Sequence, residues 1–237
     1  MAEESWGLLL SCEHGGAKVP RPYLAAFSPE EKALLATHRG WDAGALAVAK
    51  QLAQSFGCAL VFTEISRLLV DLNRSAHHRT CLGPPFRDAD PEIKAAIFET
   101  YYWPYRLAFE ERLEKMLEKH GKVLHLAIHS FTPVLNGETR NADLGLLYDP
   151  GRPSEKRWAD RLHDALDPLP PALRIRRNYP YLGKADGLTA ALRKKFAARR
   201  YAGLEIELNQ SAVAKRRDRD AIAKKLGAAI AAARAMF

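Results

Sequence analysis

The segment KVLHLAIHS, residues 122–130, is the clearest strand in the sequence. Its β-branched Val123 and Ile128 favour a strand over a helix. The distinction matters for His125 and His129, because on a helix they would share one face and could bind a single metal ion. On a strand they lie roughly 13 Å apart, which is too far for one ion. We therefore expect a buried strand that brings only His129 to a site, with His125 as a structural histidine.

A second apolar run, residues 7–13, stops at His14 and two glycines and predicts another buried strand that enters a loop. Strands alternate with helical segments along the rest of the chain, and this pattern predicts a largely parallel, layered α/β sheet. In such sheets, binding and catalytic sites lie beyond the carboxyl ends of the strands. His14 and His129 both fall at strand ends, so we expect them to contribute to one site.

The other elements follow from apolar periodicity and from turn residues. The sequence predicts further strands at residues 58–64, 144–148, 173–177 and 203–208. It predicts helices at residues 43–56, 91–120 (as one helix or two), 154–166, 188–199 and 212–236. Neither an internal repeat nor a low-complexity linker divides the chain, so we expect a single domain over residues 1–237.

The composition is that of a globular protein. Of the 237 residues, 47% are hydrophobic and 27% are charged, which supplies a core and argues against disorder. No apolar run approaches the roughly 20 residues that cross a bilayer. The acidic start, residues 1–5, lacks the basic flank of a secretory signal, so we expect a cytoplasmic protein. The three cysteines are too scattered for a disulfide framework or a Cys-x-x-Cys zinc site, and we expect Cys12 and Cys58 to be core residues.

The net charge of +8 raises the alternative of a non-catalytic protein that binds anions or nucleic acid. Its densest basic stretches are residues 174–177, 193–200 and 215–219. None of them interleaves aromatic residues as a nucleic-acid platform does. Solvated helix faces are therefore the favoured interpretation of these stretches, and we do not expect a nucleic-acid partner.

His14 and Asp42 are candidate metal ligands. The glycines after His14 let the backbone approach an ion, although a hydrogen-bonded loop histidine fits these residues equally well. Asp42 stands where residues 38–44 lead into a predicted helix, so it is either the helix N-cap or a ligand. As a ligand it gives a His/Asp/His site of His14, Asp42 and His129 with an open position for water. His38 is a weaker candidate.

Two carboxylates, Glu205 and Glu207, are candidates for acid–base chemistry. One residue separates them on a predicted strand, so both side chains point to one face of the sheet. They are either charges on a solvent-facing strand or a source of a general base. Such a base takes a proton from an attacking water and passes it to the leaving amine. The residues alone do not choose between the two glutamates.

The segment SRLLVDLNR, residues 66–74, is a candidate binding site for an acidic substrate. Arg67, Asn73 and Arg74 supply donors in the fork geometry that suits carboxylates. The alternative is that the arginines form surface ion pairs with acidic neighbours such as Asp71.

Several of these motifs occur in the order found in the N-formylglutamate amidohydrolase family, which the chain resembles from about residue 8 to residue 210. Each motif is short and moderately specific, and the shared order carries the match. The matching segments are residues 11–16, 41–44, 67–74, 129–130 and 207–210.

The resemblance implies a zinc-exopeptidase-like fold, a three-layer α/β architecture with a mixed, mostly parallel sheet flanked by helices. It implies one Zn²⁺ and hydrolysis of a small anionic N-acyl amino acid such as N-formylglutamate. It also implies roles for individual residues: metal binding by His14, Asp42 and His129, general base catalysis by Glu207, and substrate carboxylate binding by Arg67, Asn73 and Arg74.

The opening motif departs from the family pattern. Formylglutamate hydrolases tend to have a Pro-His-Ser-Gly type sequence where residues 13–16 of this chain are Glu-His-Gly-Gly. The difference indicates a divergent branch of the family and leaves the substrate less defined than the reaction type. The motif is also similar to the Gly-His-Gly-Gly start of amidases that release peptide from muramic acid, so a cell-wall peptide amidase is an alternative.

Overall fold

The computed structural model describes residues 6–170 and 172–236, and the acidic start at residues 1–5 lies outside them. Its main sheet contains six strands, all of which the sequence predicts. They are β1 (Gly7–Cys12), β2 (Ala59–Phe62), β3 (Val123–Phe131), β6 (Leu144–Leu147), β7 (Ile175–Arg177) and β8 (Tyr201–Asn209). A small hairpin of β4 (Val134–Leu135) and β5 (Glu138–Thr139) follows β3.

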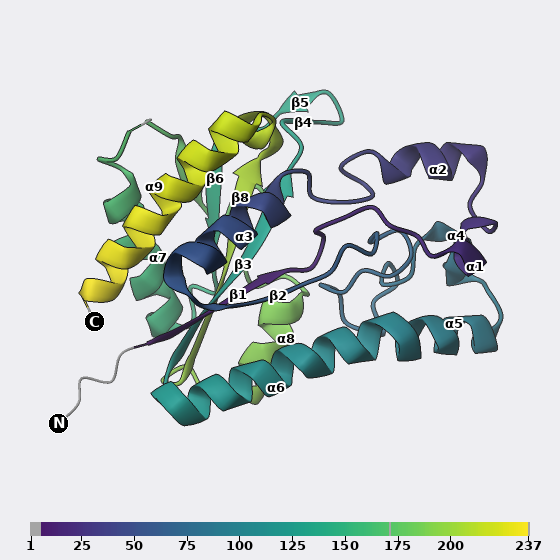
Figure 1. Cartoon of the computed structure of the whole chain (residues 1–237), viewed down its shortest axis with the longest axis horizontal. Helices are drawn as coiled ribbons and strands as arrows, with labels where there is room; N and C mark the ends of the chain where they lie inside the picture. Colours follow the sequence, from purple (N-terminus) through teal and green to yellow (C-terminus); the bar gives the residue numbers. More distant parts are fainter. Residues whose placement is uncertain (1–5, 171, 237) are drawn as a thin grey trace.

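The strand order in the sheet is β2-β1-β3-β8-β6-β7. Every neighbouring pair is parallel except β6 and β8, which are antiparallel. Helices cover both faces (Figure 1). This arrangement confirms the expected mixed, mostly parallel sheet with a helical layer on each side.

One face of the sheet is covered by the three helices α3 (Ala45–Phe56), α7 (Pro153–Leu166) and α9 (Arg216–Ala235). The opposite face packs against α6 (Trp103–His120) and α8 (Leu188–Lys195). Alternate residues of each strand enter the two cores, as the two-residue period of a strand requires. In β3, for example, Leu124 and Leu126 belong to the first core and Val123 to the second.

The remaining helices are short, and most were not predicted. They are α1 (Arg21–Leu24), α2 (Pro29–Leu35), α4 (Pro84–Arg87), α5 (Pro91–Ile97), the π-helix η1 (Phe98–Tyr102) and the 3₁₀ helix η2 (Gln210–Val213). The predicted helix at 91–120 is the continuous run of α5, η1 and α6. None of the helices in the described ranges is long and apolar enough to cross a membrane.

His125 is fully buried in the second core, as expected of a structural histidine. Its ring nitrogens contact Ser11 Oγ at 2.7 Å and Tyr201 Oη at 2.8 Å. Its ring also packs 4.5 Å from that of Phe109, centroid to centroid. Burial lowers the pKa of His125 to about 3.

We expect the neutral state of His125 to make the fold sensitive to mild acid. Between pH 6.5 and pH 3 the unfolded chain binds a proton at this histidine that the folded chain does not, so stability falls as the pH falls. His125→Gln removes the titration but keeps a donor and an acceptor. Between pH 7 and pH 5, the wild type should lose about 2 kcal/mol of unfolding free energy relative to this variant in urea titrations.

A control for this measurement is Tyr201→Phe, which keeps the imidazole. Its pH dependence should parallel that of the wild type. A difference between wild type and His125→Gln that stays constant over the same pH range would contradict a neutral, buried His125.

Candidate active site

A cavity of about 190 Å³ opens beyond the carboxyl ends of β1, β3 and β8. All seven residues that the sequence places in a site line this cavity: His14, Asp42, Arg67, Asn73, Arg74, His129 and Glu207. His38 lines it as well. The parallel pairing of β1 with β3 brings His14 near His129. His14 lies just beyond the end of β1, whereas β3 continues past His129 to Phe131, so this strand is longer than predicted.

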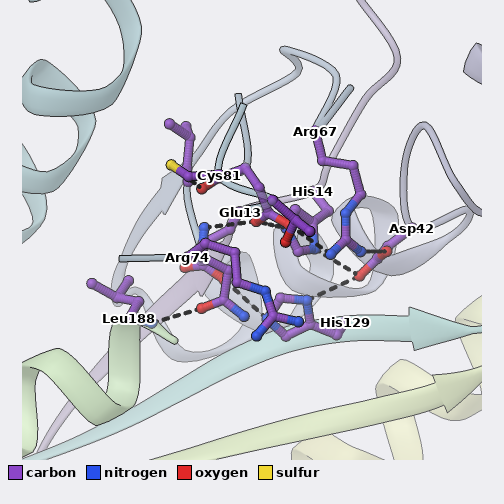
Figure 2. A network of polar contacts seen from close by, with 12 residues as sticks. Glu13, His14, Asp42, Arg67, Arg74, Cys81, His129 and Leu188 are labelled. Carbon is purple, nitrogen blue, oxygen red and sulfur yellow. Dashed lines mark hydrogen bonds and ion pairs between the residues drawn. The ribbon is translucent and has the colours of Figure 1, made fainter. Parts of the chain in front are cut away.

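The two histidines share one carboxylate. The Nδ1 atoms of His14 and His129 lie 3.4 Å and 2.9 Å from Oδ2 of Asp42. The ring centroids are 5.1 Å apart, and Figure 2 shows both rings beside Asp42. All three side chains are buried.

Each histidine uses its other nitrogen for a second buried carboxylate. His14 Nε2 lies 2.7 Å from Asp71 Oδ1, and His129 Nε2 lies 3.0 Å from Glu13 Oε2. The His14 contact is a hydrogen bond, whereas the His129 contact is at ion-pair distance without hydrogen-bond geometry. A carboxylate at the far nitrogen orients the ring of many metal-binding histidines.

These three residues fit a metal ion. One ligand atom from each of His14, Asp42 and His129 can be chosen so that all lie within 4.8 Å of one another. The Nδ1 atom of His14 is buried and has no hydrogen-bond partner among the described residues. Two nitrogens and one oxygen form a donor set that suits Zn²⁺ and several other divalent ions.

The charges at the site favour a cation between the histidines. Burial alone would lower the pKa of His129, but Asp42 and Glu13 raise it well above its usual value. Burial alone would raise the pKa of Asp42, but the two histidines hold it far below its usual range. Glu13 behaves similarly: burial opposes its ionisation, yet His129 lowers its pKa to about 2. The ionised carboxylates attract positive charge to the two histidines, either as protons or as a metal ion that replaces those protons.

The sequence allowed Asp42 to be either a helix N-cap or a metal ligand, and the structure shows that it is not the N-cap. The N-cap of α3 is Gly44, with a φ of 86°, and no side chain caps the helix. Oδ2 of Asp42 instead accepts a hydrogen bond from the backbone N–H of Ser130 at the end of β3. A β-carbon at Gly44 would lie 2.8 Å from the side chain of Val213, so both the left-handed conformation and the packing favour glycine there.

Arg67 is tied to the same carboxylates. Its guanidinium lies 2.7 Å from Asp71 Oδ2 and 3.7 Å from Asp42 Oδ1. Burial alone would raise the pKa of Asp71, but Arg67 and His14 keep it below its usual range. Sequence reasoning did not assign a site role to Asp71 or to Glu13. Two features of the sequence could have indicated these roles: Glu13 directly precedes His14, and Asp71 lies inside the basic segment 66–74.

Arg74 is free of carboxylate partners in residues 6–170 and 172–236. Its NH1 donates to the backbone oxygen of Asp186 at 2.8 Å, and no ion pair involves its side chain. Asn73 beside it accepts a hydrogen bond from the backbone N–H of Leu188 at 2.7 Å. His38 adds little positive charge, because burial and nearby arginines lower its pKa.

The register of β8 against β3 distinguishes its two glutamates. Glu207 pairs across the sheet with His129, whereas Glu205 pairs with Ala127. Glu207 is buried, and its Oε2 has no hydrogen-bond partner in the described part of the chain. Burial raises the pKa of Glu207 to about 8, and the negative charges of Asp42 and Glu205 act in the same direction. Glu207 is therefore the glutamate next to the two histidines.

The chain is similar to known proteins along most of its length. The family model for N-formylglutamate amidohydrolase matches residues 6–214. The chain belongs to the N-formylglutamate amidohydrolase family. This membership makes it a relative of enzymes that hydrolyse amide bonds, and the match spans every residue of the cavity named above.

Two solved structures share the fold along almost the whole chain. The gene product Atu2144 from Agrobacterium tumefaciens is 30% identical, with a TM-score of 0.76 over 97% of this chain and 93% of that one. An N-formylglutamate amidohydrolase from Ralstonia eutropha JMP134 is 19% identical, with a TM-score of 0.72 over 98% of this chain and 94% of the other. A comparison with curated protein sequences gives no match.

We expect the geometry around His14 to control metal affinity. Asp71→Asn keeps the shape of the side chain but weakens the acceptor at His14 Nε2, so binding of a divalent ion, offered as zinc, should weaken about 10- to 100-fold. His129→Ala removes a ligand and should abolish stoichiometric binding. Chelator competition and elemental analysis of the purified proteins measure both effects.

Asp143→Asn is the matched control, because Asp143 pairs with Arg174 and does not line the cavity. It should bind metal as the wild type does. Wild-type affinity in Asp71→Asn, or metal retained by His129→Ala, would argue against this metal site.

Proposed function

We propose that the protein is a metal-dependent amidohydrolase that cleaves the amide bond of a small N-acyl amino acid, with formyl as the simplest acyl group. One observation carries the proposal. Two buried histidines, each with its own carboxylate at Nε2, place their Nδ1 atoms at a third carboxylate, that of Asp42, and Glu207 lies beside them in the same cavity. Membership of an amidohydrolase family supports it.

His14, Asp42 and His129 would hold the metal, for which we propose Zn²⁺. A bound ion of this kind polarises an acyl carbonyl and makes a water molecule more acidic. The surrounding residues keep the ligands in place: Glu13 and Asp71 fix the two rings, and Arg67 balances the charge of Asp71 and Asp42.

Glu207 is the residue that we assign as general base. Its carboxylate lines the cavity next to His129 in the β3–β8 register, and one of its oxygens has no partner in the described chain. In its ionised form, which a neighbouring cation favours, Glu207 can take a proton from the attacking water and pass it to the nitrogen of the amine that leaves. No other lining carboxylate combines this position with a free buried oxygen.

Arg74 is the residue that we assign to the carboxylate of the substrate. Arg67 already contacts Asp71 and Asp42, whereas Arg74 faces the cavity with no acidic partner among the described residues. A guanidinium binds a carboxylate through two parallel hydrogen bonds. Such a clamp would orient the scissile amide toward the metal ligands and Glu207.

We expect Glu207→Gln to retain the metal but to lower kcat at least about 1,000-fold, because the amide cannot accept the proton of the attacking water. Steady-state assays with N-formyl amino acids, together with elemental analysis of the same samples, measure both properties. Substantial turnover in a metal-loaded Glu207→Gln protein would exclude Glu207 as the base.

We expect Arg74→Ala to raise KM about 10- to 100-fold for an N-formyl amino acid, because a charge-assisted bidentate pair is lost. The same substrate with its α-carboxylate converted to an amide should show little change. Arg74→Lys keeps the charge but loses the fork and should fall between the two. Equal effects of Arg74→Ala on the acid and the amide would remove Arg74 from this role.

A further inference from the structure

The cavity contains a second carboxylate, Glu205, that the proposed chemistry does not use. It lies two residues before Glu207 and on the same face of β8, so it is about 7 Å further along the strand, away from the metal ligands. In the neighbouring strand it faces the position of Ala127, whose side chain supplies no polar group. Glu205 therefore lines a different part of the same cavity, which we call the recess.

Glu205 is held in one orientation, but only one of its two carboxylate oxygens accepts a hydrogen bond from a described residue. Thr189 Oγ1, which is fully buried, donates a hydrogen bond to Oε1 of Glu205 at 2.7 Å. The other oxygen, Oε2, has no hydrogen bond to any described residue. No lysine, arginine or histidine of residues 6–170 and 172–236 lies within ion-pair distance of this carboxylate. A fixed acceptor thus faces the cavity without a counter-ion.

Asn73 supplies a fixed donor beside it. The bond from the Leu188 N–H to Oδ1 defines which end of the Asn73 amide is the oxygen, so Nδ2 is the end left to donate. Nδ2 has no acceptor among the described residues. A β-carbon at Gly187 would lie 3.1 Å from Asn73 Oδ1 and 3.5 Å from Glu205 Oε1, so the two side chains flank the same glycine.

This pair of groups discriminates between the chemical groups that a substrate could present. A carboxamide carries both an acceptor for Asn73 Nδ2 and an N–H donor for Glu205 Oε2. A carboxylate would set its charge against that of Glu205, and an ammonium group would leave the Asn73 donor without an acceptor. The recess is therefore complementary to a neutral carboxamide.

The other charged residues of the cavity also disfavour a second substrate carboxylate. Of the two arginines that line it, Arg67 is occupied by Asp71 and Asp42, which leaves Arg74 for one substrate carboxylate. Asp186 is not a free acceptor, because its two carboxylate oxygens accept hydrogen bonds from the backbone and the hydroxyl of Ser75. A dicarboxylate such as glutamate would lack a second arginine in this lining.

We propose that Glu205 and Asn73 select an N-acyl amino acid whose side chain ends in a carboxamide, of the glutamine or asparagine class, and disfavour a second carboxylate. This inference rests on the proposed function and assigns the end of the substrate that Arg74 does not hold. Glu205 acts on substrate choice, and Glu207 acts on the reaction.

N-formyl-L-glutamine and N-formyl-L-glutamate test the inference, because they differ in this one group. The metal-loaded wild type should prefer the glutamine compound by about tenfold or more in kcat/KM. Glu205→Gln offers a donor where the wild type has only acceptors, so the preference should vanish or reverse toward glutamate. Calorimetric titration of the same compounds into Glu207→Gln, with and without Glu205→Gln, should give the same order in binding without turnover.

Thr189→Val is the matched control, because it removes the hydroxyl that orients Glu205 and keeps the carboxylate. It should weaken the preference without reversing it. A wild type that prefers glutamate, or a preference that Glu205→Gln leaves unchanged, overturns the inference alone. Equal loss of kcat on both substrates in Glu205→Gln would make Glu205 a part of the acid–base machinery instead. If the metal-loaded wild type neither binds nor hydrolyses any N-formyl or N-acetyl amino acid, the proposed function fails, and the inference fails with it.

Discussion

The carboxylate of Asp42, shared between His14 and His129, is the interaction on which the rest of the site depends. Glu13, Asp42 and Asp71 are between 1% and 4% exposed, and burying three carboxylates so close together is costly unless positive charge compensates them. Arg67 supplies part of that charge, and protonated histidines could supply more only in the absence of a metal, because a histidine that ligates a metal ion is neutral. A divalent ion between the histidines would supply the rest and would make use of the His14 nitrogen that has no hydrogen-bond partner among the described residues.

The sheet makes this concentration of charge possible. The strands β1, β3 and β8 are parallel neighbours, so their carboxyl ends meet at one edge, and the polar residues lie where the strands end. Apolar side chains fill the strands behind that edge on both faces. His125 is the exception inside the strand, and its neutral ring is satisfied by Ser11 and Tyr201 rather than by a ligand.

The sequence was sufficient for the six strands and for seven residues that line the cavity. Strand periodicity and strand-end histidines are local signals, and the family resemblance assigned the roles of the residues. It was not sufficient where local chemistry allows two roles. Asp42 precedes a helix, as an N-cap does, and only the fold shows that its carboxylate contacts Ser130 and the histidines. Glu205 and Glu207 share a face in any strand, and the β3–β8 register is what places Glu207 beside His129.

The short helices escaped prediction for a different reason. The segments α1 and α4 each span four residues, too short for a helical period to emerge. The helix α2 did carry a readable signal, a capping box in which Ser28 and Glu31 exchange hydrogen bonds with each other's backbone. The role of Arg67 could also be assigned only from the three-dimensional structure. An arginine in this segment can bind either a substrate carboxylate or an acidic residue of the chain, and in the fold Arg67 contacts the buried Asp71.

The site divides into two parts that the chain builds from different segments, and this division bears on how the family could diversify. The proposed metal ligands and Glu207 come from the loop after β1, the loop before α3, β3 and β8, whereas the recess is lined by Asn73 and Glu205, which flank Gly187. Glu205 belongs to the same strand as the base, yet its side chain contacts Thr189 and none of the metal ligands. A substitution at position 205 can therefore change the group that the recess accepts while the ligands and the base keep their geometry. If both proposals hold, reaction type and substrate choice are separable properties of one cavity: residues near the strand ends carry out the reaction, and Glu205, two residues earlier in β8, selects the substrate.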